Sequence, residues 1–252
     1  MFNLETLISD PYNRKARLQP ALLTLLPILV ASVLLVPEIQ SSWGAAVGVV
    51  VYCGGAMWLT QLGRDRGKAL EPMLFKAWDG KPSVAMLRHR DSYLSKATRE
   101  RYRAFLERRV PDLKLASPEE EERSPTNADD GYESATAWLL AQTRDRERFR
   151  LIFEENINYG FRRNIWALKP LALVVDGLLI TVVLTTVVIF STDSVTSTLQ
   201  VIDKPTWAVA LFTLAHMLVF AVMVRRDWVR ATANAYSQQL LAACDILDSS
   251  DR

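Results

Sequence analysis

Apolar residues are concentrated in four long runs, and charged residues lie almost entirely between these runs. The runs cover residues 21–36, 44–59, 171–190 and 207–224. A hydrocarbon core about 30 Å thick needs about 20 mostly apolar helical residues, and each run approaches that length with its uncharged flanks. The pattern therefore predicts an all-α integral membrane protein with four transmembrane helices. Buried helices of a soluble domain are the alternative, but the remaining polar residues would cover four such runs poorly.

Basic residues fall on one side of the predicted spans. Of the 30 Lys and Arg residues, only Lys204 lies in the short connections 37–43 and 191–206. The positive-inside rule then places both termini and the segment between the second and third runs in the cytoplasm. We expect a multi-pass protein of a bacterial cytoplasmic (inner) membrane. The basic start also suits a cleaved signal peptide, but a second run follows so soon that a retained hairpin is favoured.

This topology divides the chain into five predicted segments. They are a cytoplasmic N-terminal segment (1–17), a first transmembrane hairpin (18–62), a helical cytoplasmic domain with a long juxtamembrane helix (63–169), a second hairpin (170–225) and a cytoplasmic C-terminal helix (226–252).

Within the cytoplasmic domain, the polar and breaking residues predict local structure. Gly and Pro at 79–83 indicate a turn, and Ser95 is a candidate cap for a helix that stops before Pro111. The segment 118–131 is rich in Glu, Pro, Asn and Asp and lacks large apolar residues. We expect it to be a solvated loop.

A single helix is predicted from 133 to 169, directly before the third run. Apolar residues recur there every four positions and form a stripe on one helix face, expected to pack on the helix 226–247. Arg162 and Arg163 mark the membrane surface. The helix either relays a change in the cytoplasmic domain to the spans or is a passive stalk. The stripe consists of Phe149, Phe153, Ile157, Phe161 and Ile165.

Two ionisable residues interrupt the apolar runs. Asp176 lies six residues into the third run, and His216 lies nine residues from the cytoplasmic end of the fourth. Their depths differ by about one helical turn, so an antiparallel pair of helices brings them together. An intramembrane carboxylate is a functional candidate by default. The pair either lines a pore or responds to protons; alternatively, Asp176 is protonated and bonded to a neighbour, or it reaches water.

Small residues in the second run predict close helix packing. Gly44 and Gly48 form a GxxxG element, and Gly55 lies on the same helical face. Such residues let helix backbones approach one another in a membrane. The element does not say whether the partner helix belongs to the same chain.

The basic segment 88–109 is the candidate ligand surface. Arginines interleaved with Tyr93 and Tyr102 suit a phosphate-bearing ligand. The alternative is a solvated basic helix that lies near an anionic leaflet or pairs with the Glu run at 119–122. The candidate residues are Arg88, Arg90, Arg99, Arg101 and Arg103.

The sequence carries no pattern typical of catalysis. Its two histidines are His89 and His216, and its two cysteines are Cys53 and Cys244. These counts and spacings support neither a metal site nor a nucleophilic triad, and no Gly-rich phosphate loop occurs. We therefore expect no cofactor, no metal and no enzymatic activity.

Three segments carry a resemblance to known proteins. "GKPSVAMLRHRD", "RERYRAFLERR" and "RLIFEENINYGFRRNIWALKP" resemble segments of uncharacterised bacterial multipass membrane proteins, over most of the cytoplasmic part. That resemblance implies no activity. In architecture alone, four spans with a modest cytosolic domain are similar to pore-forming effectors of bacterial antiviral systems.

These observations favour a regulated membrane effector or channel-like protein, acting in antiviral defence. Its cytoplasmic domain would sense a protein partner or a small phosphate-bearing ligand and relay the change to the spans. Besides the lipid bilayer, a second copy of the chain is an expected partner; nucleic acid is not. Two alternatives stay open: a non-conducting scaffold that recruits a cytoplasmic partner, and a proton-coupled transporter subunit built on Asp176 and His216.

Overall fold

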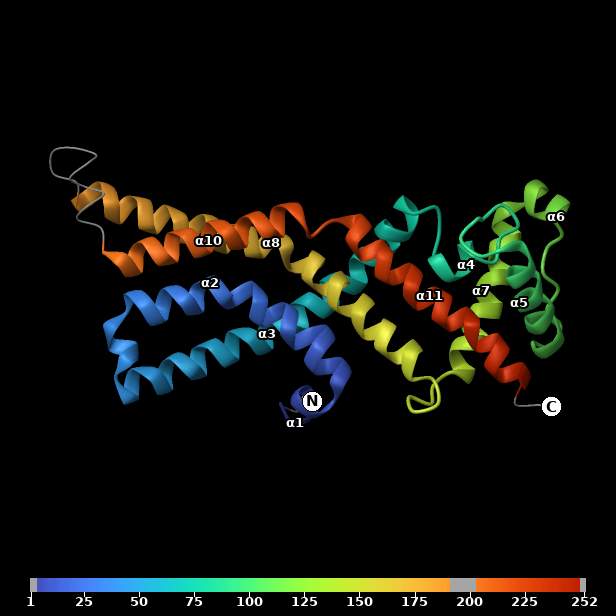
Figure 1. The fold of residues 1–252 in the computed structure, drawn as a ribbon, viewed down its shortest axis with the longest axis horizontal. Helices are drawn as coiled ribbons and strands as arrows, with labels where there is room; N and C mark the ends of the chain where they lie inside the picture. Colours follow the sequence, from blue (N-terminus) through green and yellow to red (C-terminus); the bar gives the residue numbers. More distant parts are fainter. Residues whose placement is uncertain (1–3, 191–202, 250–252) are drawn as a thin grey trace. The chain divides into compact units, whose positions relative to one another are not determined.

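Helices are the regular secondary structure of the residues that the computed structural model describes, 4–190 and 203–249, and no strand occurs among them (Figure 1). Four helical segments, beginning at Asn13, Ser42, Arg150 and Lys204, are long and apolar enough to cross a membrane. The predicted all-α class with four such helices is confirmed. The elements are α1 (Leu4–Ser9), η1 (Asn13–Leu18), α2 (Gln19–Leu35), η2 (Pro37–Gln40), α3 (Ser42–Ala77), α4 (Pro82–Ala85), α5 (Lys96–Arg109), α6 (Pro118–Arg123), α7 (Pro125–Gln142), α8 (Arg150–Phe190), α10 (Lys204–Val222) and α11 (Arg226–Ser249).

The chain forms two compact units. The first unit combines Met1–Ala69 with Gly160–Trp228, and the second combines Leu70–Tyr159 with Val229–Arg252. Helices α3 and α8 contribute residues to both units. Residues 191–202 and the chain ends, whose membrane side the sequence predicts, lie outside the described residues.

The unit boundaries differ from the predicted segment boundaries at 63 and 169. Residues 63–69 and 160–169 belong to the first unit, because their small and polar residues pack there. Gly63 meets Leu168, and the side chain of Asn164 lies against Gly67. Helix α8 also continues through Pro170 without ending.

The first unit is built around helix packing of small apolar residues. Helix α2 packs against α10, and α10 runs beside the later part of α8 (Figure 1). One buried cluster joins Ala21, Leu59 and Leu168. The remaining buried residues of this unit include Ala31, Ile165, Ala172, Val183, Val209, Phe220 and Val224.

The second unit has a larger core of aromatic and aliphatic side chains. Helices α4, α5, α7 and α11 and the start of α8 contribute to it. Ser95 caps α5 by accepting a hydrogen bond from the Thr98 N–H, as the sequence predicts. The predicted C-terminal helix is also present, and α11 buries Leu240, Leu241 and Cys244. Tyr132, Leu106 and Leu139 are fully buried at the centre.

The expectation of a solvated loop at 118–131 is wrong. This segment forms α6 and the first turns of α7. Ser117 and Glu120 make a reciprocal capping box at the start of α6, which satisfies two backbone donors. Glu121 is 4% exposed and bonds to Tyr132. The buried Glu121 and the capping box of α6 therefore outweigh a composition typical of loops.

The single helix expected from 133 to 169 is interrupted. Helix α7 ends at Gln142 and α8 begins at Arg150. Between them, the Asp145 carboxylate accepts hydrogen bonds from the Glu147 and Arg148 N–H groups at 2.9 and 3.1 Å. Such side-chain bonds to nearby backbone donors compete with helix continuation. Residues 133–169 contain no proline, but this did not guarantee one helix.

Candidate functional site: a polar cluster among apolar helices

The structure brings Asp176 of α8 and His216 of α10 into contact, as their depths in the sequence predict. His216 Nδ1 lies 3.0 and 2.9 Å from the two carboxylate oxygens. The Asp176 side chain is fully buried, and that of His216 is 8% exposed. An ionisable pair therefore sits inside the helix packing of the first unit.

A third group completes this cluster, and it belongs to the backbone. His216 Nε2 lies 3.1 Å from the Leu23 carbonyl oxygen in α2. In an α-helix this carbonyl would accept from the N–H four residues later, but that residue is Pro27, which has no N–H. His216 of α10 thus bonds the Leu23 carbonyl, which α2 itself leaves without a hydrogen-bond donor. We call Asp176, His216 and the Leu23 carbonyl the proline-capping triad.

The triad fixes its own number of protons. A carbonyl only accepts, so His216 Nε2 must carry a hydrogen. One further hydrogen lies between Nδ1 and the Asp176 carboxylate, on either partner. Both forms contain two protons and have zero net charge, which suits apolar surroundings. Removing one proton leaves a buried negative charge, and it also leaves the carbonyl without a donor if the remaining proton lies on Nδ1.

The His216 ring also borders an apolar pocket. Phe212 and Phe220 flank the ring, with centroids 6.4 and 4.4 Å away. The pocket holds about 370 Å³, and His216 is its one ionisable lining residue. Both ring nitrogens already have hydrogen-bond partners, so the histidine has no free ring nitrogen for a ligand in the pocket. The other lining residues are Leu23, Phe161, Ile165, Ala215, Val219, Met223, Val224 and Trp228.

A second proline of the same region shows a related arrangement, in which the carbonyl belongs to η1, a π-helix whose carbonyls accept from the N–H five residues later. Pro20 lies four residues after Ala16 and cannot donate to its carbonyl. Asn164 Nδ2 of α8 donates to that carbonyl at 2.7 Å, and Asn164 is 1% exposed. Lys169 serves a related purpose, since its Nζ bonds the Ala221 and Val224 carbonyls near the end of α10. Polar side chains of this unit therefore complete helix backbones.

Within the chain, the close approaches between helices lie at other glycines than Gly44, Gly48 and Gly55, and packing of these three against a second copy stays a prediction. A β-carbon at Gly48 or Gly55 would meet only side chains at ordinary distances, 3.8 Å from Ile39 and 3.6 Å from Leu25. At Gly44 it would collide with the Glu38 carbonyl of the preceding turn. The close approaches between helices lie instead at Gly63, against Leu168, and at Gly67 and Gly160.

The predicted relay stripe is divided between the units. Phe149 and Ile157 are buried in the second unit, and Ile165 is buried in the first. Phe153 and Phe161 are half-buried, so the stripe is not one continuous buried face.

The two arginines of the relay segment differ in their contacts. Arg162 donates to the Trp228 carbonyl at 2.8 Å and lies over its indole ring. Arg163 is 6% exposed and contacts the Asn164 amide oxygen. Neither contact was evident from the sequence, because each depends on how the helices pack.

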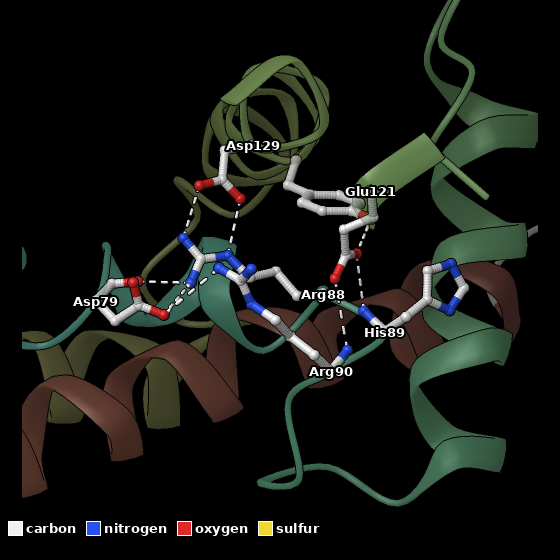
Figure 2. A network of polar contacts seen from close by, with 7 residues as sticks. Asp79, Arg88, His89, Arg90, Glu121 and Asp129 are labelled. Atoms are coloured by element: carbon white, nitrogen blue, oxygen red, sulfur yellow. Dashed lines mark hydrogen bonds and ion pairs between the residues drawn. The ribbon is translucent and has the colours of Figure 1, made fainter. Parts of the chain in front are cut away.

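The predicted anion surface at Arg88 to Arg103 is mostly an internal network (Figure 2). Arg88 is 5% exposed. Its Nε and Nη2 donate to the two oxygens of Asp129 at 2.8 and 2.6 Å, and its Nη1 lies 3.0 Å from Asp79. Arg90 is exposed and reaches Asp79 at 3.5 Å. A guanidinium that already binds two carboxylates is not available to a phosphate.

The other three arginines of this segment are also engaged. Arg99 is 6% exposed and donates to the Asp91 carbonyl. Arg103 is 7% exposed and donates to the Leu87 carbonyl and the Tyr132 hydroxyl. Arg101 lies at the surface and pairs with Asp245 at 2.8 Å. The expected ligand surface is therefore wrong for the buried arginines, because acidic and carbonyl oxygens from other elements bind them.

Glu121 joins this network to the backbone. Its carboxylate accepts from the Tyr132 hydroxyl at 2.6 Å and from the His89 N–H at 2.9 Å. Burial opposes ionisation of Glu121, but these hydrogen bonds outweigh it and lower its pKa. Burial and the bond to Glu121 raise the pKa of Tyr132 to about 12. The network is held as an anion and a neutral phenol at physiological pH.

Metal-binding and thiol chemistry find little support in the described ranges. No group of three His, Cys, Asp or Glu residues that could hold a metal ion occurs within 4–190 and 203–249. Cys53 and Cys244 are free thiols, the first exposed and the second buried. Burial raises the pKa of Cys244 to about 12, which suppresses its thiolate.

Comparisons with known proteins give no relative: no protein-family model, no curated protein and no solved structure matches this chain.

Proposed function

We propose that the protein is a regulated membrane effector or channel-like protein of the bacterial cytoplasmic membrane. In this proposal α2 with α3, and α8 with α10, form two transmembrane hairpins. Both termini and most of the second unit lie in the cytoplasm, and several copies assemble. The four long apolar helices and the one-sided distribution of basic residues support this topology.

The observation that carries the proposal is the proline-capping triad. It joins α2, α8 and α10 by hydrogen bonds in otherwise apolar packing. The two hydrogen bonds of His216 form only when the triad holds two protons and the three helices are in register. A change in either condition breaks the triad. A contact of this kind suits a closed state that opens when the helices move.

Helix α8 connects this contact to the second unit. It is one helix of 41 residues, and residues 150–159 belong to the second unit while residues 160–190 belong to the first. Binding of a partner or ligand to the second unit would act on Asp176 through this helix. Such a signal requires the bound molecule to prefer one arrangement of α8 over another.

An ion-flux assay with purified protein in liposomes tests the proposal. Asp176→Asn keeps the side chain's shape and one acceptor oxygen but removes its charge. We expect this variant to change the flux, or its pH dependence, by several-fold relative to the wild type. Thr181→Val is the matched control, because Thr181 is exposed on the same helix and its hydroxyl donates to a backbone carbonyl of that helix.

The same assay distinguishes a channel-like protein from a non-conducting scaffold. A scaffold would show no flux for the wild type or for Asp176→Asn, and its recovery of a cytoplasmic partner would be equal for both. That result would contradict the channel-like proposal. A flux driven by a proton gradient and coupled to a solute would instead identify a proton-coupled transporter.

A further inference from the structure

The apolar pocket beside the proline-capping triad opens along one side of α10. Three of its lining residues, Ala215, Val219 and Met223, follow one another at intervals of four and are exposed. Residues at this spacing lie on one face of a helix. Phe220 and Val224, which also line the pocket, are each 3% exposed. The pocket is therefore a groove with a buried wall and an open side, and all its lining residues belong to the first unit.

The groove suits an apolar occupant. Its lining is aliphatic and aromatic except for His216, whose two ring nitrogens already have hydrogen-bond partners. A polar ligand group beside this histidine would lose water without gaining a partner. The cavity holds about 370 Å³, more than twice an engineered apolar cavity of about 150 Å³ that binds benzene. The groove therefore has room for a longer hydrocarbon.

The shape of the groove matches one hydrocarbon chain. Along α10 the lining extends from Phe212 to Val224, which corresponds to about 18 Å of helix. The hydrocarbon core of a bilayer is about 30 Å thick, so an acyl chain of one leaflet reaches about 15 Å. A volume of about 370 Å³ over such a length makes the groove narrow. This favours a single acyl chain over a bulkier ring system.

Positive charge lies at one end of the groove. Val224 and Trp228 line the groove on either side of the connection between α10 and α11. Between them, Arg225 and Arg226 are exposed, and no hydrogen bond or ion pair within 4–190 and 203–249 engages either side chain. Asp227 is exposed as well, so the two arginines leave the connection with a net positive charge. An anionic group is the complementary partner for this end of the groove.

We propose that this groove binds one acyl chain of an anionic phospholipid, with the lipid phosphate at Arg225 and Arg226. The planar fork of arginine matches phosphate oxygens. In the proposed topology the connection between α10 and α11 lies in the cytoplasmic headgroup layer, where basic residues attract anionic lipids. The charged and apolar parts of the site then lie at the depths of a lipid headgroup and its acyl chain. The site rests on the proposed membrane location and does not depend on whether the protein conducts ions.

Photolabelling of the full-length protein in phosphatidylcholine liposomes tests the groove. The probe is a small fraction of phosphatidylglycerol with a diazirine in its acyl chain, and peptide mass spectrometry maps the label. We expect label at Ala215, Val219 and Met223 that unlabelled phosphatidylglycerol reduces several-fold more than added phosphatidylcholine does. Leu214 and Leu218 are the internal control, because they are exposed on the same helix outside the groove. Their label should not respond to this competition.

The pattern of label also separates this proposal from the proposed topology. Label at Leu214 and Leu218 without label in the groove would mean that another occupant, such as a second copy of the chain, fills the groove. That result would overturn the lipid site and leave the topology intact. Label in the groove that does not respond to competition would overturn the site as well. No label at any of these positions would contradict the membrane location itself.

Charge variants test the headgroup contact. Arg225→Gln/Arg226→Gln removes two positive charges at the end of the groove, whereas Arg66→Gln/Lys68→Gln removes two at exposed positions of α3 outside the groove. All four side chains are exposed, so both variants should keep their fold.

We expect unlabelled phosphatidylglycerol to compete about tenfold more weakly in Arg225→Gln/Arg226→Gln than in the wild type. Arg66→Gln/Lys68→Gln should behave like the wild type, and phosphatidylcholine should act equally on all three proteins. Equal losses in the two variants would indicate general surface attraction. Such a result, or unchanged competition in Arg225→Gln/Arg226→Gln, would overturn the assignment of the phosphate to these arginines.

Discussion

The two units use their polar side chains differently. In the first unit, His216, Asn164 and Lys169 bond backbone carbonyl oxygens at prolines or near a helix end. In the second unit, Arg88 and Arg101 bind carboxylates of other elements. The first unit uses them to complete its helices, whereas the second unit pairs charges and also uses Arg99 and Arg103 to bond carbonyls outside its helices.

This difference follows from the surroundings that each unit fits. A carbonyl without a partner costs more free energy where water is absent, so proline in an apolar helix requires a donor from a neighbouring helix. Ion pairs at a water-exposed surface need no such buried partner, and each contributes little to the free energy of unfolding. The contact types are those expected for the proposed topology, in which the first unit crosses the membrane and most of the second lies in water.

The largest effect is expected from His216→Leu. This change leaves Asp176 fully buried without its partner and the Leu23 carbonyl without a donor. Breaking a buried ionisable pair costs about 3–5 kcal/mol, which unfolding in mixed detergent micelles would measure. Leu218→Ala, at an exposed position of α10, should leave the midpoint unchanged. Equal midpoints for the two variants would show that the triad does not stabilise the first unit.

A smaller loss is expected in the second unit from Arg88→Met. The substitution removes the bidentate bond to Asp129, whose side chain is 31% exposed, so water partly replaces the arginine. We expect a loss of about 2–3 kcal/mol, seen as faster hydrogen exchange in α4 and α7. Arg101→Met removes an exposed pair and should leave the same amides unaffected. Slower or unchanged exchange in Arg88→Met would contradict a stabilising role of the buried pair.

Restoring the N–H that Pro27 lacks tests whether His216 stabilises the first unit by bonding the Leu23 carbonyl. Pro27→Ala gives the Leu23 carbonyl a helical donor and makes the bond from His216 redundant. His216→Leu should then cost about 1 kcal/mol less in the Pro27→Ala background than in the wild type. Unfolding midpoints of the four proteins give this coupling. Strict additivity would mean that His216 does not serve the proline.

The smallest effect concerns acid sensitivity of the second unit. Hydrogen bonds lower the pKa of Glu121 in the folded protein. Its ionised form therefore stabilises the fold at pH values above the pKa of glutamate in the unfolded chain, about 4.3. This stabilisation is lost as the pH falls through the lower pKa of the folded state. The wild type should therefore exceed Glu121→Gln in unfolding temperature at pH 7 and lose that advantage toward pH 3. Exposed Glu122→Gln should show no such convergence.

The sequence predicted the pairing of Asp176 with His216 because depth in an apolar run translates directly into height along a helix. The third partner escaped prediction because a backbone carbonyl carries no residue signature. Pro27 marks the deficient carbonyl at Leu23, but the donor that reaches it depends on the register between α2 and α10. Candidate membrane spans can be predicted from composition, whereas the contacts between these helices depend on their packing.

The errors in the second unit have a related cause. The Arg88 cluster looks like an open basic surface along the sequence, but Asp129 lies 41 residues away in the chain and binds it. Likewise, the composition of 118–131 indicates a loop, while burial of Glu121 against Tyr132 anchors it as helix. Local sequence shows which groups need partners and cannot show where the chain supplies them.

The proline-capping contacts also bear on biosynthesis. The Leu23 carbonyl is made 193 residues before its donor His216, and the Ala16 carbonyl 148 residues before Asn164. A nascent chain therefore lacks the side-chain donors of these two carbonyls until α8 and α10 have been synthesised. A truncated product that ends before α10 never acquires the donor at Leu23, so its α2 keeps a carbonyl that Pro27 leaves without a helical partner.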